Sequence, residues 1–142
     1  MKQPKKYLAL DVGTVRIGIA ISDPTTNIAL PLSTVHVAQS DNPCADIKKI
    51  IDENQIQTVV VGWPLELDGS EGPAIRRTKQ FLVSLKNLCP GIRIIPQDER
   101  LSSSAAENSL QMLQTKGSNK KNLVDAMATA IILQAYLDSK KT

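Results

Sequence analysis

The hydrophobic pattern of this 142-residue chain changes its period near residue 42, and that change limits the possible folds more than any other feature. Before it, apolar or alternating segments predict three strands, at residues 7–12, 16–22 and 28–37. Short connections between them favour an antiparallel meander. After it, strand-like segments alternate with helix-like ones, which indicates parallel strands added to the same sheet.

The helix signals of the second part are local and specific. Asn42 and Pro43 suit a helix cap and its first position, and Pro73 opens a second helix. A third helix is expected to be capped by Ser103 or Ser104. The fourth is expected over residues 123–137, where it is apolar nearly all round and therefore buried. The second helix carries an apolar face formed by Ile75, Thr78, Leu82 and Leu85.

Two strands separate these helices. The fourth strand is expected at residues 58–61, ended by Gly62, and the fifth at residues 92–95, stopped by Pro96. The resulting order, β-β-β-α-β-α-β-α-α, is that of an α/β protein with an RNase H-like fold. We expect a mixed five-stranded sheet, three antiparallel strands and then two parallel ones, flanked by helices. One domain over residues 1–142 is expected, with an ordered core at about 5–138.

Composition narrows the classes of function. The formal net charge of +3 tolerates a polyanionic partner but falls short of a basic nucleic-acid coat. No segment has the length or apolar content of a membrane span or signal peptide, so a cytoplasmic protein without membrane contact is expected. Cys44 and Cys89 have no metal-ligand spacing and are expected to be reduced, partly buried thiols. His36, the only histidine, is expected to be structural.

Three carboxylates stand out against this background. Asp11 ends an apolar strand, where it either accepts hydrogen bonds from the Gly13-Thr14 turn or holds a cation. Asp98 and Glu99 follow the fifth strand, where α/β proteins place their sites, although acidic pairs are common in ordinary loops. Asp125 is the only acidic residue between positions 123 and 137. It either lies in the first turn of a helix capped by Asn122 or points toward the sheet end.

Carboxylates brought to one edge of a sheet repel one another and raise their own pKa values unless a cation lies between them. Mg²⁺ or Mn²⁺ would remove this conflict, and a pair of such ions can activate water for attack on a phosphodiester. Two glycine-rich phosphate motifs, the Walker loop and GxGxxG, are absent from the sequence. The loop at residues 62–73 contains Trp63, which either stacks on a base or packs beneath its own loop.

Together these segments resemble the YqgF/RuvX family of resolvase-like and pre-16S rRNA nucleases. The resemblance covers nearly the whole chain, in the right order, at residues 10–14, 16–18, 22–23, 61–62, 64–65, 68–71, 98–102, 124–125, 128, 131–133 and 136–137. It implies an RNase H-like fold, a cytosolic setting, and Asp11, Glu99 and Asp125 as catalytic ligands of Mg²⁺ or Mn²⁺. Trp63 and Ala105 depart from the usual family pattern without removing a proposed ligand.

The resemblance also implies a substrate. It favours pre-rRNA processed at the 5′ end of 16S rRNA, with branched DNA as an alternative. A monomer or weak homodimer is expected as the working unit. We expect substrate contacts from residues adjacent to the site motifs: Thr14, Arg16, Arg100, Ser102, Lys120 and Lys121. The choice of Glu99 over Asp98 as ligand rests on the resemblance alone.

Two other classes fit parts of the chain. Sugar kinases and actin-like ATPases resemble Asp11 to Thr14, but they need two such domains around the nucleotide, and this chain is too short. A non-catalytic RNA-binding or ribosome-assembly module would keep the fold without the reaction. Metal-dependent cleavage by the purified protein separates this module from a nuclease.

Overall fold

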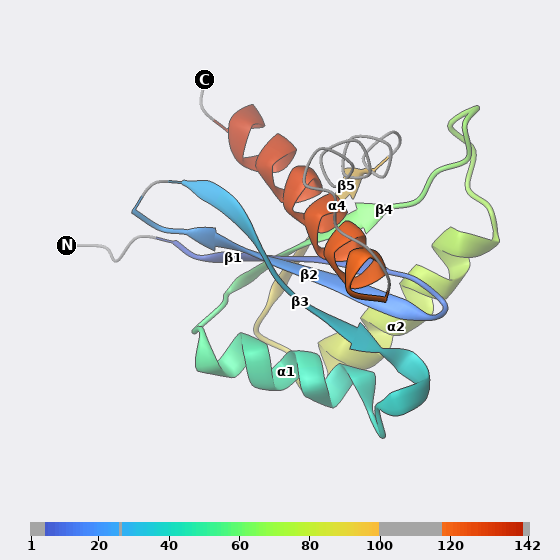
Figure 1. Cartoon of the computed structure of the whole chain (residues 1–142), viewed down its shortest axis with the longest axis horizontal. Coiled ribbons are helices and arrows are strands. Elements are labelled where there is room, and N and C mark those ends of the chain that lie inside the picture. Colours follow the sequence, from blue (N-terminus) through green and yellow to red (C-terminus); the bar gives the residue numbers. More distant parts are fainter. Residues whose placement is uncertain (1–4, 26, 100–117, 141–142) are drawn as a thin grey trace.

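The computed structural model describes residues 5–25, 27–99 and 118–140. Within them a five-stranded sheet has helices on both faces (Figure 1). The strand order is β3-β2-β1-β4-β5. β1, β2 and β3 pair antiparallel, whereas β4 and β5 run parallel to β1, which confirms the predicted mixed sheet. The strands are β1 (Tyr7–Val12), β2 (Arg16–Asp23), β3 (Ile28–His36), β4 (Thr58–Trp63) and β5 (Arg93–Asp98).

The helices divide between the two faces of the sheet. α1 (Pro43–Glu53) and α2 (Pro73–Leu88) cover one face, and α4 (Ser118–Ser139) lies across the other (Figure 1). A short 3-10 helix, η1 (Val37–Gln39), joins β3 to α1. The Asn42 side chain accepts a hydrogen bond from the Ala45 N–H at 3.2 Å, and Pro43 is the first helical residue, so the predicted start of α1 is confirmed. The helix expected after Ser103 or Ser104 lies outside the described residues.

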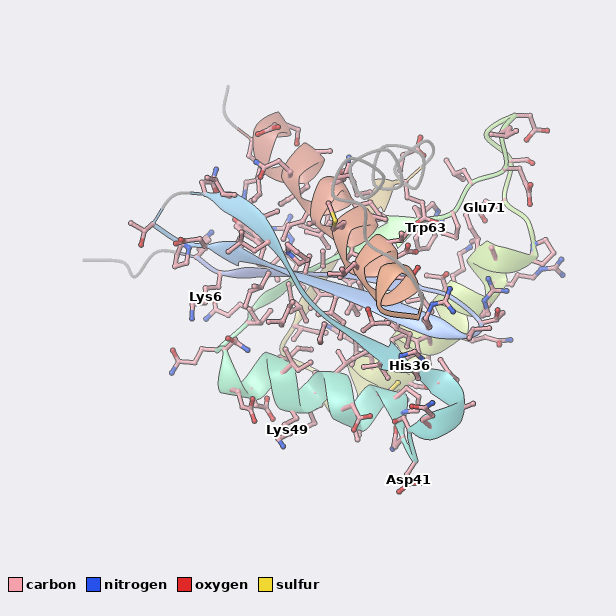
Figure 2. All side chains as sticks on the ribbon, in the orientation of Figure 1. Lys6, His36, Asp41, Lys49, Trp63 and Glu71 are labelled. Atoms are coloured by element: carbon pink, nitrogen blue, oxygen red, sulfur yellow. The ribbon has the colours of Figure 1, made fainter. Side chains whose placement is uncertain are left out.

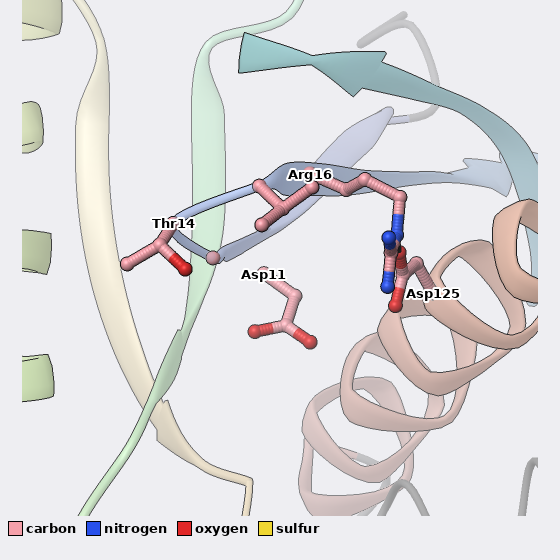
Figure 3. Close-up of a pocket in the computed structure, with 6 residues that line it drawn as sticks. Asp11, Thr14, Arg16 and Asp125 are labelled. Carbon is pink, nitrogen blue, oxygen red and sulfur yellow. Dashed lines mark hydrogen bonds and ion pairs between the residues drawn. The ribbon is translucent and has the colours of Figure 1, made fainter. Parts of the chain in front are cut away.

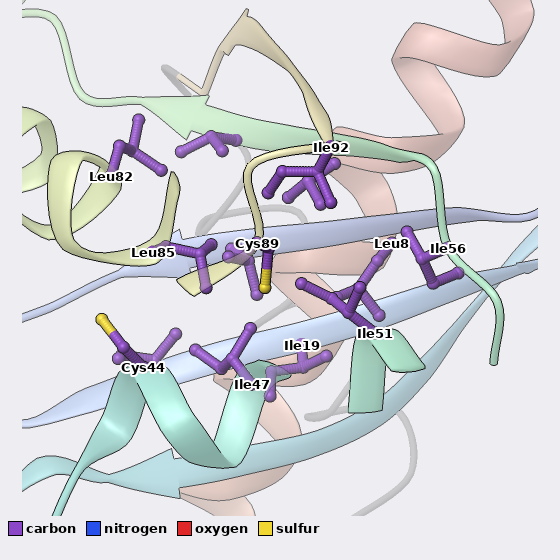
Figure 4. Packing of buried hydrophobic residues seen from close by; sticks show 14 of the residues in the cluster. Leu8, Ile19, Cys44, Ile47, Ile51, Ile56, Leu82, Leu85, Cys89 and Ile92 are labelled. Atoms are coloured by element: carbon purple, nitrogen blue, oxygen red, sulfur yellow. The ribbon is translucent and has the colours of Figure 1, made fainter. Parts of the chain in front are cut away.

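Two apolar cores result from this layering. Alternate residues of β1 point to opposite faces: Leu8 and Leu10 belong to the larger core beneath α1 and α2, whereas Ala9 packs with α4. Figure 4 shows the larger core, in which aliphatic side chains of both helices meet those of the sheet. Cys44 and Cys89 are buried there as free thiols, as predicted. The four residues of the predicted α2 face, Ile75, Thr78, Leu82 and Leu85, are all buried.

The predicted ends of β4 and β5 were wrong. β4 continues through Gly62 to Trp63, and β5 continues through Pro96 to Asp98, with Pro96 paired beside Val61. Proline lacks an N–H group, but β5 is an edge strand, so a proline nitrogen directed to the free edge removes no ladder hydrogen bond. Asp98 is therefore the last residue of β5, and Glu99 follows it directly.

The predicted start of the last helix was also wrong. α4 begins at Ser118 rather than near Leu123, so Asn122 is not its cap and Asp125 is not in its first turn. A purely local role for Asp125 at the helix start is thereby excluded. No helix in the described ranges is long and apolar enough to cross a membrane.

Candidate active site on the sheet beneath the start of α4

Asp11 lies at the carboxyl end of β1 and on the face covered by α4. Ala9, two residues earlier, packs in the α4-side core, and side chains alternate along a strand. Asp11 pairs with Gly18 of β2, and the register of Leu10 with Val61 brings Gly62 of β4 to its other side. Asp11 therefore lies between Gly18 and Gly62, and these three residues form a row across β2, β1 and β4.

Both glycines leave space that neighbouring groups fill. A Cβ atom on Gly18 would lie 2.5 Å from the Asp125 carbonyl oxygen, and it would also meet the Thr129 hydroxyl. A Cβ on Gly62 would collide with Oε2 of Glu99 and lie 3.0 Å from the Ile132 side chain. Gly18 thus allows α4 to approach the sheet closely, and Gly62 provides the place for the Glu99 carboxyl group.

The Glu99 carboxyl group lies against Gly62 and interacts with the neighbouring Asp11. Burial, the charge of Asp11 and a hydrogen bond between the two carboxyl groups raise the pKa of Glu99 to about 9. Burial also raises the pKa of Asp11, and the nearby charge of Asp125 adds to that rise. In the metal-free protein at neutral pH, the Asp11–Glu99 pair therefore shares a proton.

Asp125 reaches the site from α4, and its carboxylate forms an ion pair with Arg16. The Arg16 Nε–H donates to Asp125 Oδ2, joining the start of β2 to α4 (Figure 3). The Thr129 hydroxyl donates to the Asp125 carbonyl oxygen at 2.7 Å and so holds the helix backbone over Gly18. This placement of Asp125 follows from tertiary packing, not from the helix start.

A cleft of about 200 Å³ opens between the β1–β2 turn and α4. The Asp11 carboxylate points into this space in Figure 3. The turn is tight: the Gly13 N–H donates to the Arg16 carbonyl at 3.0 Å, and a Cβ on Gly13 would lie 2.6 Å from that oxygen. The cleft is lined by Asp11, Gly13, Thr14, Val15, Arg16 and Asp125.

The structure thus brings together five of the residues singled out from the sequence: Asp11, Thr14, Arg16, Glu99 and Asp125. Lys120 and Lys121 fall within α4, near its start. Arg100 and Ser102 lie outside the described residues.

Trp63 packs against the larger core beneath its own loop, with the Lys79 ammonium 6.0 Å from the ring centroid. Figure 2 shows Trp63 near the connection between β4 and α2, where Glu71 also lies. The Glu71 carboxylate accepts a hydrogen bond from Lys79 at 3.1 Å. Of the two roles considered for Trp63, packing beneath its own loop is the one seen in the structure. Nothing in the structure supports stacking on a base.

The donor set suits a hard divalent cation in its chemistry. Glu99 Oε2 is buried and has no hydrogen-bond partner, so an oxygen ligand is left unsatisfied beside Asp11. Three acidic, histidine or cysteine side chains arranged as a metal cage are not found among the described residues. Asp11 and Glu99 converge, whereas Asp125 is engaged by Arg16.

Sequence patterns alone assigned no part in the site to Gly18, Gly62 or Thr129. Gly18 and Gly62 were visible as part of the family resemblance, but their function follows from the β1–β2 and β1–β4 registers. Thr129 is fully buried in α4, and a polar residue within an apolar helix was the only available signal.

Comparison with known proteins shows the family of this chain. A family model described as RuvX, Holliday junction resolvase, matches residues 5–139. A protein of Sulfurihydrogenibium named "Putative pre-16S rRNA nuclease" is 43% identical over 134 residues, covering 94% of this chain and 90% of that protein. A protein of the same name from Fusobacterium nucleatum is 41% identical, covering 96% and 99%.

Solved structures share the fold at low sequence identity. The fowlpox virus resolvase in complex with Holliday junction DNA is similar with a TM-score of 0.61 at 12% identity, covering 96% of this chain and 99% of that one. RuvC of T. thermophilus in complex with a Holliday junction substrate is similar with a TM-score of 0.56 at 14% identity, covering 96% and 95%. The architecture is therefore RuvC-like and RNase H-like, as the element order predicted.

Proposed function

Because this chain belongs to the RuvX family of nucleases, we propose that it hydrolyses a phosphodiester bond in structured RNA, with the 5′ end of pre-16S rRNA as substrate. The proposal rests on the convergence of Glu99, whose Oε2 atom has no hydrogen-bond partner, with Asp11, which lines the cleft. The names of relatives about 40% identical over nearly the whole chain support the choice of RNA.

We infer that Asp11, Glu99 and Asp125 would hold Mg²⁺ or Mn²⁺. Bound in this place, such an ion supplies a Lewis acid for the phosphate oxygens and lowers the pKa of a coordinated water. Glu99 must give up its proton before its carboxylate can serve as a ligand. Asp11 interacts with both Glu99 and Asp125, so it would hold the ion together with them.

The remaining residues of the cleft suit the substrate rather than the metal. Thr14 offers a hydroxyl group, and Arg16 offers a guanidinium group, whose donors match phosphate oxygens. We infer that the phosphodiester enters this cleft between the β1–β2 turn and α4. Lys120 and Lys121, at the start of α4, would extend a cationic path along the nucleic acid.

A second candidate substrate is a four-way DNA junction. The family model is described as a Holliday junction resolvase, and that description favours branched DNA independently of the curated relatives. The two substrates contain the same kind of phosphodiester bond in different nucleic acids, so one site could cleave either. The experiment that follows therefore includes both the RNA and the DNA junction.

The test is cleavage by the purified protein of a labelled pre-16S rRNA fragment and a four-way DNA junction, with Mg²⁺, Mn²⁺ or EDTA. Metal-dependent cuts in the RNA support the proposal, and cuts in the junction alone reassign the substrate. Asp11→Asn and Asp125→Asn should abolish cleavage with an unchanged circular dichroism spectrum. Asp41→Asn, a matched change at an exposed residue before α1, should leave it intact. RNA binding without any cleavage would instead indicate an assembly factor.

A further inference from the structure

We propose that Arg16 is the built-in counter-cation of Asp125 in the metal-free protein, and that metal binding displaces its guanidinium group toward the phosphate of the substrate. The inference rests on the proposed metal-dependent nuclease function. It assigns Arg16 two successive partners, first a carboxylate of the site and then the nucleic acid. Arg16 would thereby act as a substrate-binding residue that couples the two binding events.

The contact itself is specific and long-range in the sequence. Arg16 lies at the first position of β2, and Asp125 lies in α4, 109 residues away. The Nε–H of Arg16 donates to Oδ2 of Asp125, and the two side chains are 29% and 26% exposed. An ion pair with this exposure is open to small cations from solvent. It is therefore neither locked in the core nor fully screened by water.

The Asp125 carboxylate cannot bind the Arg16 guanidinium group and a divalent metal ion at once without strong repulsion between these two cations. A guanidinium group against one oxygen of Asp125 repels a divalent ion at the other, because charges a few ångströms apart interact strongly in a partly buried cleft. The described residues contain no convergent group of three acidic, histidine or cysteine side chains, so Asp125 does not yet form one site with Asp11 and Glu99. Release of Asp125 from Arg16 would leave its carboxylate free to complete the Asp11–Glu99 pair.

The displaced guanidinium group would meet the substrate phosphate within the same cleft. Arg16 lines this cleft together with Asp11 and Thr14, so it need not leave the site when Asp125 changes partner (Figure 3). Its five N–H donors match phosphate oxygens in a fork geometry that the single ammonium of lysine lacks. Metal and phosphodiester would then strengthen each other's binding, since each favours the same released state of Arg16.

The first test measures Mn²⁺ binding to the metal-free protein by the electron paramagnetic resonance signal of free Mn²⁺. Arg16→Gln removes the competing cation and should tighten Mn²⁺ binding about fivefold, the factor expected for loss of one partly exposed ion pair. Arg16→Lys should fall between the two. Arg93→Gln makes the same charge change at the start of β5, the opposite end of the sheet from the site, and should bind like wild type.

The second measurement follows the Arg16 Nε–H directly in ¹H–¹⁵N spectra of the wild-type protein during titration with Mg²⁺. Displacement predicts a saturable shift of this resonance at the same metal concentrations that saturate binding, and the Arg93 resonance should not move with it. This NMR measurement uses the wild-type protein, so it does not depend on whether Arg16→Gln folds.

The possible outcomes distinguish the displacement of Arg16 from the proposed metal-dependent nuclease function. Saturable Mn²⁺ binding by wild type with equal or weaker binding by Arg16→Gln, or an Arg16 resonance that stays fixed, overturns the displacement and leaves the proposed nuclease function standing. Absence of saturable binding by folded wild type overturns both. Tighter binding by Arg16→Gln together with a moving Arg16 resonance supports the displacement.

Discussion

The carboxyl group of Glu99 lies over Gly62, and its Oε2 atom takes the place that a Cβ atom on residue 62 would need. Gly62 is next to Asp11 in the row that crosses β2, β1 and β4. The missing side chain at position 62 is therefore what allows Glu99, from beyond the edge strand, to reach the carboxylate of a central strand. Site formation depends on a residue that takes no part in the chemistry.

Gly62→Ala tests this relationship. The added methyl group should push the Glu99 carboxyl away from Asp11 and weaken Mn²⁺ binding by about tenfold, the lower range for loss of a ligand's supporting contact. Gly91→Ala is the matched control, because a Cβ there has nothing within 4 Å. Calorimetric Mn²⁺ titration of both variants, with thermal melts to verify folding, provides the measurement. Wild-type affinity in a folded Gly62→Ala protein would contradict the positioning role.

The raised pKa of Glu99 predicts an unusual dependence of stability on pH in EDTA. Its pKa is about 9 in the folded chain and near the ordinary 4.5 when unfolded. Between these values the folded state binds more protons, so the contribution of Glu99 is complete below pH 4.5 and is lost as pH rises toward 9. Glu99→Gln, which cannot ionise, should exceed wild type in free energy of unfolding by about 1–3 kcal/mol at pH 8.5.

Urea unfolding at pH 5.5 and 8.5 measures this difference. The gap between Glu99→Gln and wild type should widen from the lower to the higher pH. Glu53→Gln, on the exposed side of α1, removes a carboxylate of the same type and should show no such widening. Parallel behaviour of Glu99→Gln and wild type would show that the Glu99 carboxyl is not held protonated beside Asp11.

Glu99 and its neighbour Asp98 are expected to differ in function. Asp98 ends β5 on the exposed surface, whereas Glu99 is half-buried against Asp11. Glu99→Gln should be inactive at every Mn²⁺ concentration, because it removes a proposed ligand. Asp98→Asn should retain cleavage with a raised metal requirement, since it changes a charge close to Glu99 without removing a proposed ligand. Activity assays across a Mn²⁺ titration decide the ranking, and its reversal would assign the ligand to Asp98.

Local patterns explain why most of the fold was predictable. Asn42 and Pro43 set the start of α1 through contacts within one turn, and the β1–β2–β3 meander joins neighbouring segments. Pro96 misled the strand prediction because its tolerance depends on β5 being an edge strand, a property of the whole sheet.

The candidate site residues could be singled out from the sequence, but their arrangement in space could not. The Gly18–Asp11–Gly62 row depends on the parallel register of β1 with β4, about fifty residues apart in the chain, which no local pattern encodes. The Arg16–Asp125 pair likewise depends on how closely α4 approaches Gly18. Arg16 could be recognised from the sequence as a cation near the site, but its partner in the metal-free protein could not.

Lys120 and Lys121 provide the last prediction, since two adjacent cations fall near the start of α4, the helix that carries Asp125 to the cleft. If both contact phosphates, Lys120→Glu with Lys121→Glu should weaken RNA binding and lower the slope of log affinity against log salt by about 1.4, at about 0.7 per single-strand phosphate. Lys48→Glu with Lys49→Glu makes the same charge change on α1, on the opposite face of the sheet. Fluorescence anisotropy with a labelled RNA across a salt series compares the two double variants. A wild-type slope for Lys120→Glu/Lys121→Glu would move the nucleic-acid path away from α4, with Arg76 and Arg77 of α2 as the next residues to test.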